Sequence, residues 1–415
     1  MNNPLDVDFV RRQFPALSDS QVFMDNAGGS LTLGRVADRI RDYLLTTNVQ
    51  LGASYRISAA ASERYATARQ RMAEMLNAAS SQEIVFGPST TILLKLLARS
   101  VAVVIDRGDE VVVTRIDHEA NIGCWLELES VGAKVRFWER NSDSGDLELE
   151  DLDALLGDRT RLVCLTHVSN ILGTINPVRD ISRRVHEHGA WVCIDGVAHA
   201  PHRAIDVQAL DVDFYALSLY KTYGPHHAVL YGRKEALLEV GSANHFFFAN
   251  DHIPGKLEPG NANYELSWGA AGIVDYLEEL GTRLVPDTGG RAARDAAWHA
   301  IAAHEQELSE RLLGFLQTRS DVRIIGRPEA SAAVRVPTVS FVHEKLRSVD
   351  VVTALDPHDI GIRFGHFYAL RLIRDLSLPE EDGVVRVSMV HYNTLEEVDR
   401  LIAALEPALD GRQGV

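Results

Sequence analysis

Cysteine is scarce in this sequence, and its placement excludes two kinds of site. Three cysteines occur in 415 residues, at Cys124, Cys164 and Cys193. They form no CxxC pair and no Cys/His spacing of the zinc-finger type, so neither a disulfide framework nor a metal site is expected. Two of them lie in the apolar runs RLVCLTHV and WVCID, in which a free cysteine behaves as a small hydrophobic side chain.

Positive charge and long apolar stretches are also in short supply. Lysine and arginine number 42 against 58 acidic residues, which gives a net charge of −16 and argues against non-specific nucleic-acid binding. No apolar run approaches the length of a membrane span, and the start MNNPLDVDFVRRQFPAL lacks the charged and apolar segments of a secretory signal. We expect a cytoplasmic protein that binds neither membranes nor nucleic acids.

Seven short apolar runs alternate with helical patterns in the first two thirds of the chain. They span residues 83–87, 110–114, 134–138, 161–168, 191–195, 213–219 and 228–232. Runs that are apolar throughout suit strands buried on both faces of a mainly parallel sheet. The segment 177–188, which Gly189 ends, has the length of a crossover helix. These patterns predict an α/β domain with a mainly parallel seven-stranded sheet.

The last third of the chain has a different pattern. A helix over 264–280 precedes the breaker-rich stretch GTRLVPDTGG, and a long Ala-rich helix over 291–318 follows. The strands VRIIG, TVSFV and VVRVSMV and the amphipathic segment LEEVDRLIAALEPAL complete the chain. We predict a large domain over 20–280 and a smaller α+β domain over 281–415 that also takes in residues 1–19.

Polar side chains follow several of the predicted strands. After EIVFG come Ser89, Thr90 and Thr91 at the start of an apolar helix, where free N–H groups suit a phosphate. Four further strands lead into DHEAN (117–121), HVSN (167–170), DG (195–196) and LYKTYGP (219–225). Each could be an ordinary helix cap. Because ligands bind beyond the carboxyl ends of parallel strands, together they predict a pyridoxal phosphate site.

The chemistry of that cofactor explains each residue type. A carboxylate such as Asp195 keeps the pyridine nitrogen protonated, which makes the ring an electron sink. An imidazole can lie on the ring, and an amide can bond its phenolic oxygen. A lysine supplies the amine and, once desolvated, a base. Of the six lysines, Lys221 alone follows a strand and precedes a Gly-Pro turn, whereas Lys234, Lys256 and Lys345 stand in polar, loop-like contexts.

The motifs, read in chain order, resemble those of the class V aminotransferases, and most closely their cysteine-desulfurase-like branch. The matching pieces cover nearly the whole chain: FMDNAGGS (23–30), FGPSTTILL (86–94), DHEAN (117–121), THVSNILGT (166–174), IDGVAHAPH (194–202), SLYKTYGPH (218–226), EPGNAN (258–263), RFGHFYA (363–369) and VRVSMVHYNTLEEVD (385–399). No single piece is specific, but the combination is. The resemblance implies the aspartate aminotransferase fold (fold type I) and pyridoxal 5'-phosphate as cofactor.

Carried over position by position, the resemblance also implies roles for individual residues. Lys221 would bind the cofactor as a Schiff base, Asp195 would pair with the pyridine nitrogen and His118 would stack on the ring. Asn170 would contact the phenolic oxygen, and Arg386 would bind the α-carboxylate of an amino-acid substrate. Further contacts to cofactor or substrate would come from Ser89, Thr90, Thr91, Ala198, Ser218, Tyr220, Asn26, Ala27 and His366. Such enzymes are usually homodimers, and the partner's phosphate ligand would fall near Gly260 and Asn261.

Departures from the family pattern concern the substrate side of the site. Where desulfurases carry a nucleophilic cysteine, this chain has Tyr368. Ala198 stands in place of a usual Gln, Tyr220 in place of a His, and Asn261 in place of a Thr. In the segment NVQLGAS, where desulfurases often carry basic or imidazole groups, this chain has none. The cofactor half of the pattern is therefore kept, and the substrate half is changed.

We expect an enzyme that labilises an amino acid at Cα without a protein persulfide, most readily a C–S lyase that performs β-elimination. Lys221 would be the base, and Tyr368 or His366 the acid at the leaving group, although Tyr368 could equally be a pocket wall. Transamination and epimerisation stay open. So does a desulfurase that uses Cys124, whose apolar setting IGCWLEL favours an inert thiol. A cofactor-binding protein without turnover is a further alternative, against which the intact Lys221, Asp195 and Arg386 argue.

Overall fold

A seven-stranded sheet forms the centre of the computed structural model, which describes residues 4–17, 20–142, 144–260 and 262–411. In spatial order its strands are β2 (Ile84–Gly87), β8 (Ala228–Gly232), β7 (Phe214–Ser218), β6 (Trp191–Asp195), β5 (Thr160–Thr166), β3 (Glu110–Thr114) and β4 (Lys134–Trp138). Strand β8 pairs antiparallel with both of its neighbours, and the other pairings are parallel. The predicted α/β class and mainly parallel sheet are confirmed.

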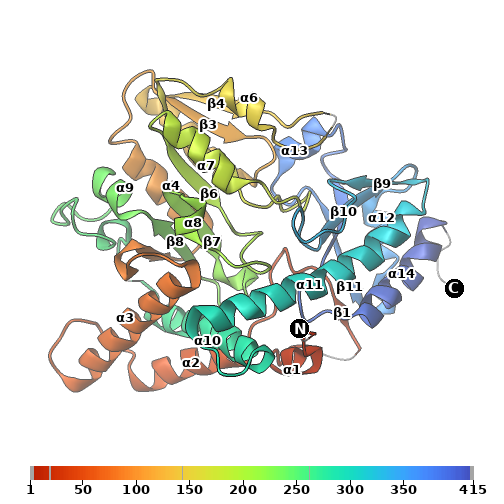
Figure 1. Cartoon of the computed structure of the whole chain (residues 1–415), viewed down its shortest axis with the longest axis horizontal. Coiled ribbons are helices and arrows are strands. Elements are labelled where there is room, and N and C mark those ends of the chain that lie inside the picture. The colour runs from red at the N-terminus through yellow and green to blue at the C-terminus, as the bar shows by residue number, and fades with distance from the viewer. Residues whose placement is uncertain (1–3, 18–19, 143, 261, 412–415) are drawn as a thin grey trace.

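Helices cover both faces of this sheet, as Figure 1 shows. Along β3, Val111 and Val113 join the core on the side of α4 (Thr90–Val101), whereas Val112 joins the core on the side of α7 (Val178–Glu187). All three valines are buried. Successive side chains of a strand point to opposite faces, so a strand with two buried faces must be apolar throughout.

A smaller antiparallel sheet lies in the C-terminal part. Its order is β12 (Arg363–Gly365), β13 (Val384–Ser388), β10 (Thr338–His343) and β9 (Val322–Ile325). It shares a third core with α11 (Gly290–Gln317) and α14 (Leu395–Leu409), in which Leu312 and Leu401 are fully buried. Strands β1 (Val22–Phe23) and β11 (Ile360–Gly361) pair in parallel and tie the N-terminal region to this part.

The remaining helices complete the layers. They are α1 (Val7–Arg12), α2 (Gly34–Thr46), α3 (Arg56–Leu76), α5 (Gly123–Leu126), α6 (Leu149–Asp153), α8 (Val207–Leu210), α9 (Lys234–Glu239), α10 (Tyr264–Leu284), α12 (Ser348–Thr353) and α13 (Leu370–Asp375). Helix α10 runs past residue 280, so the predicted domain boundary falls inside a helix; the division itself stays a prediction. Among the described helices, none is both long and apolar enough to cross a membrane.

Two expectations from the sequence are wrong in detail. Strand β5 ends at Thr166 instead of continuing to residue 168, because Val168 instead forms an isolated antiparallel bridge with Ile175. Lys256, expected in a polar, loop-like context, has a buried side chain instead of an exposed one. It is fully buried in a short 3-10 turn, where its Nζ donates to the carbonyl oxygens of Val240 at 2.6 Å and Asn250 at 2.8 Å.

Candidate active site

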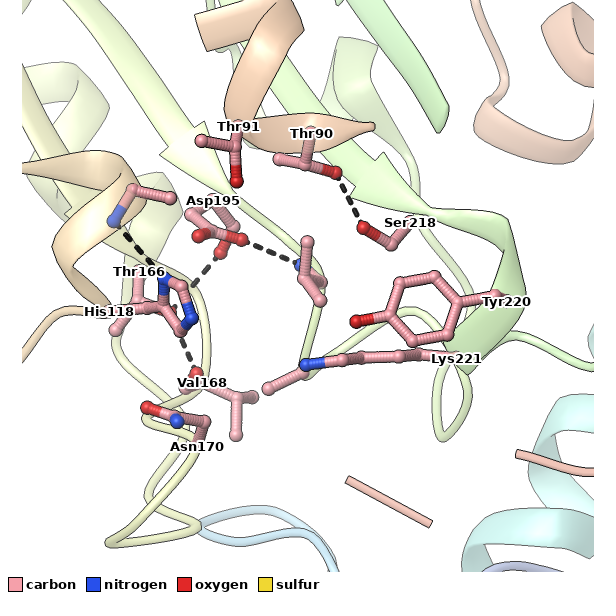
Figure 2. A pocket seen from close by; sticks show the side chains of 13 residues that line it. Thr90, Thr91, His118, Thr166, Val168, Asn170, Asp195, Ser218, Tyr220 and Lys221 are labelled. Atoms are coloured by element: carbon pink, nitrogen blue, oxygen red, sulfur yellow. Dashed lines mark hydrogen bonds between the residues drawn. The ribbon is translucent and has the colours of Figure 1, made fainter. Parts of the chain in front are cut away.

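The N-terminus of α4 forms one end of a pocket, which we call the inner pocket. Thr90, Thr91 and Ser218 line it, and Thr90 Oγ1 lies 2.7 Å from Ser218 Oγ (Figure 2). Ser89 does not line it, because its hydroxyl caps the helix and accepts from the N–H of Ile92 at 3.3 Å. The hydroxyls of Thr90, Thr91 and Ser218 and the positive end of a three-turn helix make this end suited to an anion.

Asp195 also lines the inner pocket, at the carboxyl end of β6. Its side chain is buried, and Oδ1 accepts a hydrogen bond from the N–H of Val197 at 2.9 Å. Burial raises the pKa of this carboxyl, and the nearby Lys221 partly opposes that shift. A buried carboxylate of this kind is stabilised by a cationic partner, and a protonated pyridine nitrogen is such a partner.

Lys221 enters the same pocket from the short turn η4 (Leu219–Lys221) that follows β7. In Figure 2 its side chain runs beside the ring of Tyr220, with the amine pointing into the pocket. Burial, and to a smaller extent the cation of Arg386, lower the pKa of Lys221 to about 8, although Asp195 acts in the opposite direction. About a tenth of this amine is therefore neutral, and hence nucleophilic, at pH 7.

His118 and Asn170 flank the amine. His118 starts the turn η2 (Glu119–Asn121), and its Nδ1 accepts from the N–H of Ala120 at 3.1 Å. Burial, and then the charges of Lys221 and Arg386, lower the pKa of His118 to about 4, so the imidazole is neutral at ordinary pH. Asn170 Nδ2 donates to the carbonyl oxygen of Phe367 at 2.9 Å.

These residues fit pyridoxal 5'-phosphate by the chemistry of their groups: hydroxyls at a helix N-terminus, a buried carboxylate, a neutral imidazole and an amine of lowered pKa. The inner pocket encloses about 460 Å³ of empty space, its open mouth included. Ala198 and Tyr220 also line it. The sequence reasoning did not single out four further residues that line this pocket: Ala120, Thr166, Val168 and Val197. Ala120, Val168 and Val197 each lie within two residues of a predicted one.

An outer pocket adjoins the inner one and shares His118, Asn170, Tyr220 and Lys221 with it. Its other predicted residues are Ala27, His366, Tyr368 and Arg386, and the unpredicted ones include Arg363, Phe367 and Glu381. The structure thus brings together nearly all of the predicted residues. Asn26 lies in neither pocket: it is buried and donates to the carbonyl oxygen of Ser388 at 2.8 Å. Asn261 lies outside the described residues.

Arg386 is held rigidly at the base of the outer pocket. Its side chain is almost fully buried, and its Nη1 donates to the carbonyl oxygen of Asn170 at 3.2 Å. Its Nη2 donates to Asp25 Oδ1 at 3.1 Å, and the guanidinium lies over the ring of Phe367 at 3.6 Å. Within the described part of the chain, Nε has no hydrogen-bond partner. A planar guanidinium with an open donor edge can receive a carboxylate.

Tyr368 lies at the mouth of the outer pocket with 69% of its surface exposed. Its ring centre is 5.3 Å from that of His118 and 6.1 Å from that of His366. The three thiols are all buried. Cys124 Sγ donates to the carbonyl oxygen of Ala120 at 3.2 Å, and burial raises its pKa and that of Cys164. In the ranges that the structure describes, no three His, Cys, Asp or Glu side chains are placed to hold a metal ion.

Comparison with known proteins agrees with this site. The profile of the family described as Aminotransferase class-V matches residues 22–401. The aminotransferase-like protein FGM3 of Gibberella zeae is 44% identical over 411 residues, which are 97% of this chain and 98% of that protein. The cysteine desulfurase-like protein ustD of Aspergillus flavus is 34% identical, over 98% of this chain and 91% of its own. The apo cysteine desulfurase of Thermococcus onnurineus NA1 has a TM-score of 0.87 at 27% identity, over 99% and 100% of the two chains. The chain belongs to the class V aminotransferase family, whose members are pyridoxal-phosphate-dependent enzymes.

Proposed function

We propose that this enzyme is a C–S lyase that eliminates the sulfur substituent from Cβ of an amino acid without forming a persulfide on itself. The observation that carries the proposal is the residue at the mouth of the outer pocket. By the family resemblance, Tyr368 takes the position at which desulfurases carry their nucleophilic cysteine. It lines the outer pocket, whereas the three thiols present are buried. A sulfur that leaves the substrate would therefore meet no exposed protein thiol at the mouth of this pocket.

The residues of this chain divide the work of binding and proton transfer. Bound pyridoxal phosphate supplies an electron sink that stabilises negative charge at Cα. Arg386 would bind the α-carboxylate through its open edge and fix the Cα–H bond toward Lys221. Lys221, with a pKa lowered to about 8, would take the Cα proton on Nζ, since burial makes its neutral form accessible near neutral pH.

The second half of the reaction breaks the C–S bond. The electron pair left at Cα forms a double bond to Cβ, and sulfur departs with the electrons of the C–S bond. A proton from the phenol of Tyr368, or from the imidazole of His366, would neutralise that sulfur. The released unsaturated fragment then takes up water and gives pyruvate and ammonia. The site needs no further co-reactant for this sequence.

The alternatives differ in their products. Transamination and epimerisation would use the same Lys221 and Arg386 but would leave the C–S bond intact. A desulfurase acting through Cys124 would release alanine, and the raised pKa of that buried thiol disfavours it. A protein that binds the cofactor without turnover would have no use for a lysine with a lowered pKa beside a buried arginine.

We also propose that the enzyme works in the cytoplasm as a homodimer, as its family commonly does, with the partner subunit reaching the phosphate end of the inner pocket near Gly260. The left-handed φ of +78° at Gly260 and its exposed position support a turn that is presented outward. A homodimer would place this turn against the neighbouring copy.

The test is a product analysis of the cofactor-loaded enzyme with L-cystine and with L-cysteine. L-Cysteine should give pyruvate, ammonia and sulfide in equal amounts, and L-cystine should give pyruvate, ammonia and a cysteine persulfide in equal amounts, with little alanine from either. Tyr368→Phe and His366→Asn, compared side by side, identify the acid, because only loss of the true donor should slow release of the sulfur. Alanine as the main carbon product, or no product from either amino acid, would contradict the proposal.

A further inference from the structure

The segment that carries Tyr368 has an unusual backbone. Phe367 has φ +47° and Tyr368 has φ +59°, so two successive residues with full side chains are left-handed. This region is unfavourable for residues other than glycine, because Cβ crowds the backbone. Such a conformation persists only where the surroundings hold it, and the contacts of this segment therefore indicate what fixes it.

The carbonyl groups of these two left-handed residues are both bound by residues of the seven-stranded-sheet part. The backbone N–H of Glu119 donates to the carbonyl oxygen of Tyr368 at 2.8 Å. Asn170 Nδ2 donates to the carbonyl oxygen of Phe367 at 2.9 Å. The segment itself follows β12 of the smaller sheet. These two hydrogen bonds thus join two parts of the molecule directly over the outer pocket.

A bidentate ion pair reinforces this junction from outside the pockets. Arg371 Nε lies 2.9 Å from Glu119 Oε2, and Arg371 Nη2 lies 2.9 Å from Glu119 Oε1. Glu119 directly follows His118, and Arg371 lies in the first turn of α13, three residues after Tyr368. Among the described residues that line the inner and outer pockets, neither of the two is found. They do not face the site, but each lies next to a residue that does.

We propose that Glu119 and Arg371 are positioning residues. Their ion pair, which we call the latch, holds the Tyr368 segment against the His118 turn and so fixes the position of the Tyr368 ring relative to the His118 ring. Glu119 acts twice, through its N–H on Tyr368 and through its carboxylate on Arg371. Breaking the ion pair frees α13 and lets the strained segment relax, which moves Tyr368 away from His118 and opens the outer pocket. The side chains are 42% and 29% exposed, so the latch is weak enough to open and is sensitive to salt.

The chain offers a matched control for this latch. Arg374 and Glu380 form a second bidentate pair, at 2.8 and 3.0 Å, that also involves α13 but does not include Glu119 or Arg371. Glu380→Gln therefore removes an equivalent surface charge pair without touching the contacts of Glu119. Glu119→Gln and Arg371→Gln remove the latch. The charge-swap variant, Glu119→Arg with Arg371→Glu, restores an ion pair of reversed polarity.

Hydrogen–deuterium exchange on the apo and the cofactor-loaded protein is the primary measurement. In Glu119→Gln and Arg371→Gln, the amides of residue 119 and Ala369 are expected to exchange roughly two- to fivefold faster than in wild type. Glu380→Gln should leave these exchange rates unchanged, and the charge-swap variant should restore protection. With L-cystine as probe, KM should rise while the melting temperature stays near that of wild type.

This experiment separates the latch from the proposed reaction, because amide exchange does not depend on turnover. Faster amide exchange in both single variants, with protection restored in the charge-swap variant, supports the latch even if L-cystine is not a substrate. Equal exchange in Glu119→Gln, Arg371→Gln and Glu380→Gln overturns it. If Glu119→Gln fails to fold, Arg371→Gln alone decides the question against the same control. If the charge-swap variant does not restore protection, the proposal is also overturned.

Discussion

Arg386 Nη2 lies 3.1 Å from Asp25 Oδ1, although 361 residues separate the two in the chain. The other carboxylate oxygen of Asp25 lies 2.9 Å from Nε of Arg363. Arg363 and Arg386 are directly opposite each other on β12 and β13, and like charges in that relation repel. Asp25 therefore offsets the repulsion between two arginines at the base of the outer pocket and orients one of them for a substrate carboxylate.

Asp25→Asn should leave a buried cation without its counter-charge. We expect the free energy of unfolding to fall by about 3 kcal/mol, since breaking a buried ion pair from one side is costly. Urea unfolding measures the change. Asp42→Asn is the control, because Asp42 pairs at 2.8 Å with Arg64 in an exposed setting and should cost less than about 1 kcal/mol. Equal effects of the two substitutions would mean that Asp25 is not structurally important.

Lys221→Ala should abolish the yellow colour of the cofactor-loaded protein, because Lys221 is the lysine that lines the inner pocket. Borohydride reduction followed by peptide mapping checks the site of attachment. Lys95→Ala is the matched control, since Lys95 is in the middle of α4 and about half exposed. A reduced cofactor adduct on any lysine of the Lys221→Ala protein would disprove this assignment.

Asp195→Asn should keep the cofactor but lose activity by roughly a hundredfold or more, the scale on which preorganised charge contributes to catalysis. A neutral amide has a similar shape but cannot stabilise a proton on the pyridine nitrogen. The measurement is the rate of pyruvate formation at saturating cofactor, with the cofactor content determined on the same sample. Turnover close to that of wild type would show that the buried carboxylate has another role.

Cofactor uptake should depend on pH through Lys221. Its pKa lies at about 8, below the ordinary value of 10.5, and only the neutral amine is nucleophilic. The rate of uptake by the apoenzyme should therefore rise with pH and level off above about pH 8. Asp195 raises this pKa and Arg386 lowers it. Asp195→Asn should shift the midpoint to lower pH and Arg386→Gln to higher pH, as absorbance mixing experiments can show. Shifts of the opposite sign would contradict this electrostatic account.

The sequence predicted the sheet closely because the fold imposes a local signal there. Strands buried on both faces must be apolar throughout, and the predicted ranges for β3, β4, β6 and β8 coincide with the observed ones. The site residues that directly follow the strands were also predictable, because ligands bind beyond the carboxyl ends of parallel strands. The burial of Lys256 could not be predicted, because it depends on two carbonyl oxygens at residues 240 and 250, which no short window of sequence contains.

Contacts between segments that are far apart in the chain could not be predicted from the sequence. Asp25 stands beside the predicted Asn26, yet only the pairing of β12 with β13 brings Arg363 and Arg386 together over it. Asn26 instead joins a buried network in which Tyr392 donates to its Oδ1. The left-handed backbone at Phe367 and Tyr368 could not be predicted either, because neither residue is a glycine.

The final prediction is that the wild-type enzyme gains no sulfur when it is incubated with L-cysteine. Transfer to the protein needs a thiolate at the mouth of the outer pocket, and the phenol of Tyr368 cannot carry sulfur. Burial keeps Cys124 and Cys164 protonated by raising their pKa. Tyr368→Cys places a thiol at this exposed position and should gain one sulfur atom while alanine appears, which makes it the positive control. Intact-mass analysis, with pyruvate and alanine quantified in the same sample, gives both readouts. A wild-type protein that gains sulfur on Cys124 while alanine accumulates would identify it as a desulfurase with a relocated nucleophile.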